Sequence, residues 1–155
     1  MGALLAVAQT TESGLDDHDP AYQRPGFLDL GELPERALQV TGDIPAPGRR
    51  TLVFFDRSGR VERLCDALAG NDLLDRADVA IVVAGRAPKC EADVMLVSDP
   101  RGRLAHEFGL HEPRDGGPSV GYAVVDSEGR IRYRTLDPHD ASELFEVSTI
   151  LDATP

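Results

Sequence analysis

Two cysteines, Cys65 and Cys90, carry the side chains of this sequence that are best suited to redox chemistry. A cysteine thiolate attacks peroxides and disulfides, and nearby cations or a helix N-terminus lower the pKa of the thiol. Cys65 lies in a helical pattern that follows an apolar run, and Arg57, Arg60 and Arg63 precede it. This pattern predicts a candidate catalytic thiol at Cys65, with Arg63 among the cations that would stabilise its thiolate.

Both cysteines also fit an ordinary structural role. Cys65 lies on an apolar helical stripe that it shares with Val61, Leu64 and Leu68. A free cysteine in such a stripe behaves as a small hydrophobic core residue. Cys90, in the segment APKCEAD, is either a reactive thiol whose pKa Lys89 would lower or a loop thiol without a function. The residues themselves leave both alternatives open.

The composition excludes some classes of protein. The chain has 155 residues and a formal net charge of −11, spread along the sequence. A phosphate backbone attracts clustered cations, so we expect no nucleic-acid partner. No window approaches the roughly 20 apolar residues of a membrane span, and the apolar segment 3–8 lacks the basic start of a signal peptide. We therefore expect a cytoplasmic protein without a membrane partner, in which the cysteines are thiols rather than a structural disulfide.

The histidines do not form a metal site. His18, His106, His111 and His139 are scattered, and no pair has ligand spacing on a common element. There is no C-x-x-C motif and no cysteine–histidine pairing at zinc spacing. We expect surface histidines, no metal ion and no cofactor.

The elements that must position the cysteines begin near residue 50. Residues 51–55 form a continuous apolar run typical of a strand that is covered on both faces. The helical stripe over 60–69 follows and ends at Gly70-Asn71, and residues 79–84 form a second buried strand. This spacing predicts a parallel pair joined by a right-handed crossover.

A third short run and a helix come next. Residues 94–97 are apolar, and Asp99-Pro100 then predicts a helix with Asp99 as the N-cap and Pro100 at the first helical position. Leu104 and Phe108 would form its inner face, and Gly109 would end it.

The C-terminal part reads as a β-hairpin and a helix. Strands over 122–126 and 131–135 flank a three-residue loop in which Gly129 takes the left-handed position. Asp140 then predicts the N-cap of a final helix, with Glu143 completing a capping box. The apolar face of this helix is predicted to consist of Leu144, Phe145, Val147, Ile150 and Leu151.

Residues 1–48 differ from the rest of the chain. They combine an acidic stretch, two prolines at positions 20 and 25, and a turn-rich boundary over 42–48. We expect an N-terminal extension that packs on a domain formed by residues 49–155.

Three segments of this domain resemble the AhpC/TSA peroxiredoxins: TLVFF, LVSDPRGRLAHEFGL and YAVVDSEGRIRY. The resemblance covers residues 50 to about 151. It implies an α/β, thioredoxin-like fold, in which a parallel βαβ unit precedes an antiparallel ββα unit. Peroxiredoxins reduce peroxides with one cysteine at the start of the helix after the FF strand, within a Pro-x-x-x-Thr-x-x-Cys motif, and with an arginine before a later strand.

This sequence departs from that pattern at each expected catalytic position. At direct register the proline, threonine and cysteine positions hold Asp56, Arg60 and Arg63, and the later arginine position holds Val120. A two-residue insertion would bring Cys65 into register but would put Glu62 at the threonine position. Pro118 lies two residues before the place where thioredoxin folds often carry a cis-proline.

The resemblance thus implies two functions, and we carry both. The first is a divergent peroxiredoxin-like thiol oxidoreductase. Its Cys65 would attack peroxide, Cys90 or an external thiol would resolve the sulfenate, and a thioredoxin-like reductant would recycle the enzyme. The second is a catalytically degenerate module that acts by binding a protein partner. We also consider a homodimer.

Overall fold

A five-stranded mixed sheet forms the centre of the molecule, for which the computed structural model describes residues 48–110, 113, 115–137 and 139–154. The strands are β1 (Thr51–Arg57), β2 (Asp78–Ala84), β3 (Met95–Ser98), β4 (Gly121–Val125) and β5 (Ile131–Leu136). Their spatial order is β3-β2-β1-β4-β5. β1 pairs in parallel with β2 and β2 with β3, whereas β4 is antiparallel to both β1 and β5. The predicted parallel unit and the predicted hairpin are therefore both present.

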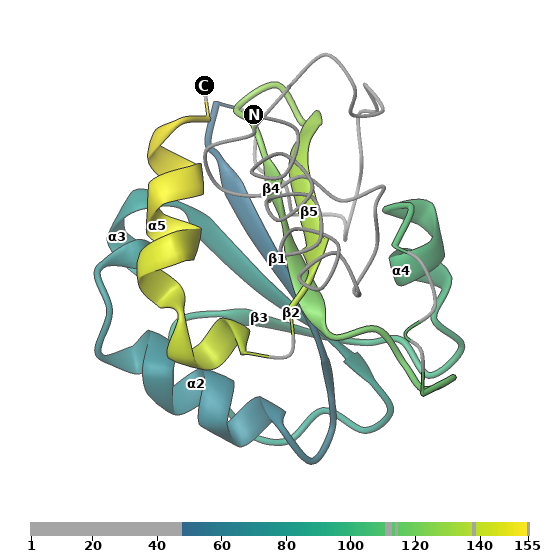
Figure 1. Cartoon of the computed structure of the whole chain (residues 1–155). Helices are drawn as coiled ribbons and strands as arrows, with labels where there is room; N and C mark the ends of the chain where they lie inside the picture. Colours follow the sequence, from purple (N-terminus) through teal and green to yellow (C-terminus); the bar gives the residue numbers. More distant parts are fainter. Residues whose placement is uncertain (1–47, 111–112, 114, 138, 155) are drawn as a thin grey trace, which may run out of the picture.

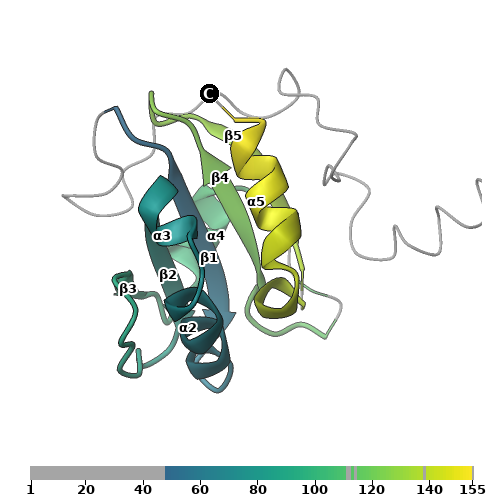
Figure 2. The same ribbon diagram turned by 90° about the vertical axis from the view of Figure 1, so that its left-hand side faces the viewer.

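Strand β1 separates two apolar layers because its side chains alternate between the faces of the sheet. Leu52 and Phe54 pack in one cluster with α2 (Val61–Ala69), α3 (Leu73–Arg76) and α5 (Leu144–Asp152). Val53 and Phe55 pack on the opposite face, where α4 (Arg103–Glu107) and Phe108 cover the sheet. Figures 1 and 2 show α2, α3 and α5 together on one face and α4 on the other.

Helices α2 and α5 bury one stripe each. The predicted stripe of α2 is confirmed, since its buried residues are Val61, Leu64, Cys65 and Leu68. In α5 the buried residues are Leu144, Val147, Ile150 and Leu151. The placement of Phe145 on this face is wrong, because its side chain is 86% exposed. Phe145 follows the first helical residue, Leu144, and is rotated by about 100° from it.

The starts of two helices differ from the predictions. The prediction that Asp99 is an N-cap is wrong, because Gly102 holds that position. The Asp99 carboxylate does accept hydrogen bonds from the Arg103 and Leu104 amides, both at 3.0 Å, in the first turn of a helix. That helix begins at Arg103, however, and not at Pro100. The capping box at Asp140 is wrong: Asp140 opens a 3-10 turn, Asp140–Ser142, and α5 begins two residues later without a side-chain cap.

The hairpin loop forms as predicted. The Asp126 amide donates to the Arg130 carbonyl at 2.9 Å, which closes a loop of residues 127–129, and Gly129 has a φ of 84°. The predicted N-terminal extension lies outside the described residues except for Gly48. No helix within the described ranges is long and apolar enough to span a membrane.

Candidate functional site

Cys65 lies in the second turn of α2 and faces the sheet. The helix begins at Val61, so the thiol position is a full turn inside the helix. Its side chain is 4% exposed and packs in the cluster that contains Leu52 and Phe54. A cysteine so placed gains little from the positive end of the helix, because the effect of the macrodipole falls off within the first turn.

Cys90 is bonded to Cys65. The two sulfurs form a disulfide whose Cα atoms are 5.6 Å apart, a separation typical of disulfides. Cys90 is half-buried in the connection between β2 and β3, so the bond joins α2 to that connection. The pairing that the resemblance implied is therefore present in this structure, and the expectation that both cysteines are thiols is wrong for this state of the protein.

The cations before Cys65 are held by other partners. Arg63 is exposed, and its Nη2 donates to Ser142 Oγ at 2.7 Å. The guanidinium of Arg57 pairs with Asp115 at 2.8 Å and donates to the Pro118 carbonyl. These contacts tie the arginines to the 3-10 turn and to the loop before β4.

A buried carboxyl group occupies the end of β1, where the resemblance would place the peroxiredoxin proline. Asp56 is 2% exposed, and its Oδ1 accepts from the Arg57 amide at 2.8 Å and from Arg60 Nε at 3.1 Å. Burial raises the pKa of Asp56, and these two residues partly offset the effect. A carboxylate here cannot supply the apolar shielding that a proline gives.

A second buried carboxyl group belongs to Asp140, which the sequence assigned only to a helix cap. Asp140 is fully buried. Its Oδ1 accepts from the Ala141 amide at 2.7 Å, whereas its buried Oδ2 has no hydrogen-bond partner. Burial, together with the nearby charge of Asp56, raises the pKa of Asp140 to about 8. The start of α2 thus combines the guanidinium of Arg60 with the buried carboxyl groups of Asp56 and Asp140, and the carboxyl groups oppose the stabilisation of a thiolate there.

The remaining catalytic position of the resemblance is apolar. Val120 lies directly before β4 and is 8% exposed. It offers no charge to a thiolate or to a peroxide. At direct register none of the catalytic side-chain types implied by the resemblance, the cysteine included, therefore stands at its expected position.

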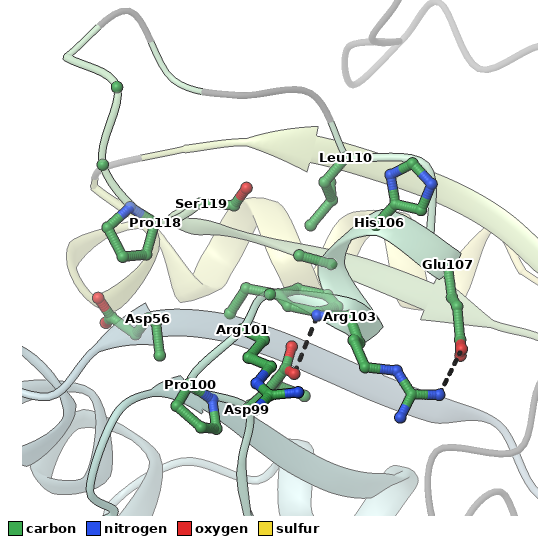
Figure 3. Close-up of a pocket in the computed structure, with 17 residues that line it drawn as sticks. Asp56, Asp99, Pro100, Arg101, Arg103, His106, Glu107, Leu110, Pro118 and Ser119 are labelled. Carbon is green, nitrogen blue, oxygen red and sulfur yellow. Dashed lines mark hydrogen bonds and ion pairs between the residues drawn. The ribbon is translucent and has the colours of Figure 1, made fainter.

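A cleft opens beside this region, at the carboxyl ends of β1 and β2 (Figure 3). Its volume is about 610 Å³. In Figure 3, Pro118 and Ser119 lie on one side and Arg101 and Arg103 on the other, with Asp56 at one end. The sequence indicated that Pro118 lies near the position where thioredoxin folds often carry a cis-proline. It gave no signal for the cleft, because four separate segments form the cleft.

Other ligand types are sparse among the described residues. His106 and His139 are both exposed, while His18 and His111 lie outside the described ranges. The carboxylates of Asp137, Glu143 and Glu146 lie within 4.8 Å of one another. We assign no metal to this group, because such acidic clusters are common on surfaces without a bound ion.

Comparisons with known proteins agree on the fold. No protein-family model and no curated protein matches the sequence. Among solved structures, Mycobacterium tuberculosis AhpC is 20% identical, with a TM-score of 0.53 over 81% of this chain and 83% of that chain. The bacterioferritin comigratory protein of Xanthomonas campestris is 16% identical, with a TM-score of 0.50 over 70% of this chain and 82% of that chain.

A third similar structure is a putative thiol:disulfide interchange protein, DsbE, from Chlorobium tepidum. It is 16% identical, with a TM-score of 0.47 over 68% of this chain and 80% of that chain. The first two likenesses, together with the strand order described above, establish that this chain has a thioredoxin-like α/β fold.

Proposed function

We propose that this protein is a thiol–disulfide redox protein whose working group is the Cys65–Cys90 pair. The observation that carries the proposal is the bond between α2 and the β2–β3 connection. If the protein acts in the cytoplasm, as we also propose, a disulfide there belongs to a redox cycle more often than to a permanent scaffold.

The β2–β3 connection is suited to a bond that opens and closes. Residues 85–94 contain no helix or strand. Their backbone hydrogen bonds within the described chain are Gly85 N–H to the Val83 carbonyl and Val94 N–H to the Ala92 carbonyl. The cysteines can therefore separate without breaking the ladder between any two strands.

The difference in exposure between Cys65, which is buried, and Cys90, which is half-buried, favours one direction of exchange. A reductant thiolate attacks the half-buried Cys90 Sγ, forming a mixed disulfide, while Cys65 leaves as a thiolate and takes up a proton. A second thiol of the reductant then attacks its own sulfur in the mixed disulfide and releases Cys90. Two electrons pass to the protein, and the reductant leaves as a disulfide. A thioredoxin-like dithiol has the required chemistry.

Exchange with thiols is better supported than reduction of peroxide. A peroxidatic thiolate needs access and electropositive surroundings. Here Cys65 is buried and bonded, and Asp56 and Val120 occupy positions where the resemblance implies a proline and an arginine. Peroxide would still serve as the oxidant of the dithiol, with Cys65 forming the sulfenate that Cys90 resolves.

A redox titration of the full chain tests this function. The protein is equilibrated in glutathione and dithiothreitol buffers, and free thiols are counted by mass spectrometry after alkylation. We expect a reversible midpoint within roughly −220 to −320 mV, the range of cytosolic glutathione. A bond that stays closed at lower potentials would refute the proposal. Dimedone labelling of Cys65 after peroxide treatment then decides whether peroxide is a substrate.

A second candidate function is that of a module that binds a protein partner. In this case the disulfide only stabilises the fold and takes no part in redox exchange. The burial of Cys65 and the absent catalytic types favour it. This candidate predicts that the titration finds no accessible midpoint. It also predicts that Cys65→Ser with Cys90→Ser keeps partner binding while losing stability.

A further inference from the structure

The cleft beside α4 lies where an open α/β sheet commonly binds ligands. After β1 the chain turns to α2 on one face of the sheet, and after β3 it turns to α4 on the other (Figure 2). Because the two connections diverge, a crevice remains outside the carboxyl ends of β1 and β2. The crevice is formed by the fold itself and does not depend on the disulfide.

The cleft contains one arginine, Arg101, that pairs with no acidic side chain of the described chain. Among the described residues, each arginine except Arg86 and Arg101 contacts a carboxylate, a carbonyl or a hydroxyl. Arg101 lines the cleft, and so does His106, whose ring has no partner within that part of the chain. An arginine without a carboxylate partner is unexpected in a protein of net charge −11.

The carboxylates that line the cleft are already engaged. Asp99 accepts two amide hydrogen bonds at the start of α4, and Asp56 is held by Arg60. Glu107 lies 4.0 Å from Arg103, so these two largely neutralise each other. Arg101 is therefore the arginine of the lining that is not paired with one of these carboxylates, and its guanidinium is available to an arriving anion.

The rest of the lining is apolar or uncharged. Phe55, Val82 and Leu110 form a floor beneath α4, with Ala105 beside them. The facing wall, residues 116–119, carries no charged side chain. The volume of about 610 Å³ falls within the range of small-molecule sites. The cleft thus combines the cationic side chain of Arg101 with a lining that is mainly apolar or uncharged elsewhere.

We propose that this cleft binds a small organic anion, a carboxylate with an aromatic or aliphatic body. Arg101 holds the carboxylate, and the apolar body lies against Ala105 and Pro118, the accessible apolar residues of the lining. The site is independent of the redox function proposed above, because Cys65 packs in the cluster on the opposite face of the sheet.

Titration by NMR with phenylbutyrate and its neutral amide tests the site in the full chain. We expect saturable shifts at Ala105, Leu110 and Gly117 with a dissociation constant in the low-millimolar range or tighter. The carboxylate should bind about three- to fivefold more tightly than the amide, as an exposed ion pair allows. Arg101→Ala should remove this preference.

Arg86→Ala is the matched control, because Arg86 is the other unpaired arginine of the described chain and does not line the cleft. It should keep the preference for the carboxylate. Equal effects of the two variants, or ligand shifts that do not saturate at the cleft, would overturn the proposal. Reduction of the disulfide should leave the affinity unchanged.

Discussion

Reduction of the Cys65–Cys90 disulfide is expected to lower the free energy of unfolding by about 3.5 kcal/mol. The bond closes a loop with a sequence separation of 25 residues. The chain-entropy relation gives a constant of about 0.6 kcal/mol and a loop term of about 2.9 kcal/mol at 25 °C. The folded state itself should change little, because the strand ladders do not involve the connection that carries Cys90.

Urea denaturation of the oxidised and reduced chain measures this difference. With a slope of roughly 1–3 kcal/mol per molar urea, the midpoint should fall by about 1.2–3.5 M on reduction. Cys90→Ser provides the control, because it cannot form the bond and should give the same midpoint with and without reductant. Its midpoint should match that of the reduced wild type to within the effect of one substitution at a half-buried position.

Equal midpoints for oxidised and reduced wild type would refute this reasoning. They would mean that the unfolded chain is already restricted without the bond, or that strain in the folded state cancels the entropic gain. A change confined to the urea slope would instead show that reduction alters the compactness of the unfolded ensemble.

Three further predictions concern the domain itself. Gly121→Ala would place a Cβ against the Thr135 carbonyl oxygen on β5 and should cost about 3 kcal/mol in urea denaturation, whereas Gly59→Ala, where a Cβ meets open space, should be nearly neutral. Since the pKa of Asp140 is about 8 in the folded state against 3.8 unfolded, unfolding releases a proton between these values. Stability should fall with rising pH in that window, by at most about 1.4 kcal/mol per unit, and Asp140→Asn should lose this slope. Phe145→Ser should change the free energy of unfolding by less than about 0.5 kcal/mol, because the ring is exposed.

The sequence predicted elements where the periodicity was strong and local. The run over β1 and the stripe on α2 specify a strand and a helix by themselves, and Gly129 specifies the hairpin loop. The short helix α3 was missed, since four residues carry too little pattern. Phe145 was misplaced, because apolar character alone does not say where a helix begins.

The candidate site was less predictable because its features are tertiary. The pairing of Cys65 and Cys90 depends on a Cα separation that spacing along the chain cannot give. Asp140 has the signature of a cap, and only the packing of its turn against α2 explains why it is buried. The cleft joins side chains from four segments, and the absence of a partner for Arg101 can be judged only in three dimensions.

Stability and redox potential of this domain must change together. The folded and unfolded chain, each oxidised or reduced, form a closed thermodynamic cycle. The free energy that the Cys65–Cys90 bond adds to folding therefore equals the free energy that folding adds to formation of the bond. For a two-electron couple, about 3.5 kcal/mol corresponds to a midpoint roughly 75 mV lower in the folded protein than in the unfolded chain. The redox titration, repeated in high urea, therefore checks the unfolding experiment independently. If the two midpoints coincide while reduction still destabilises the fold, the cycle does not close, and a third process, such as association of the reduced chain, must accompany the loss of the bond.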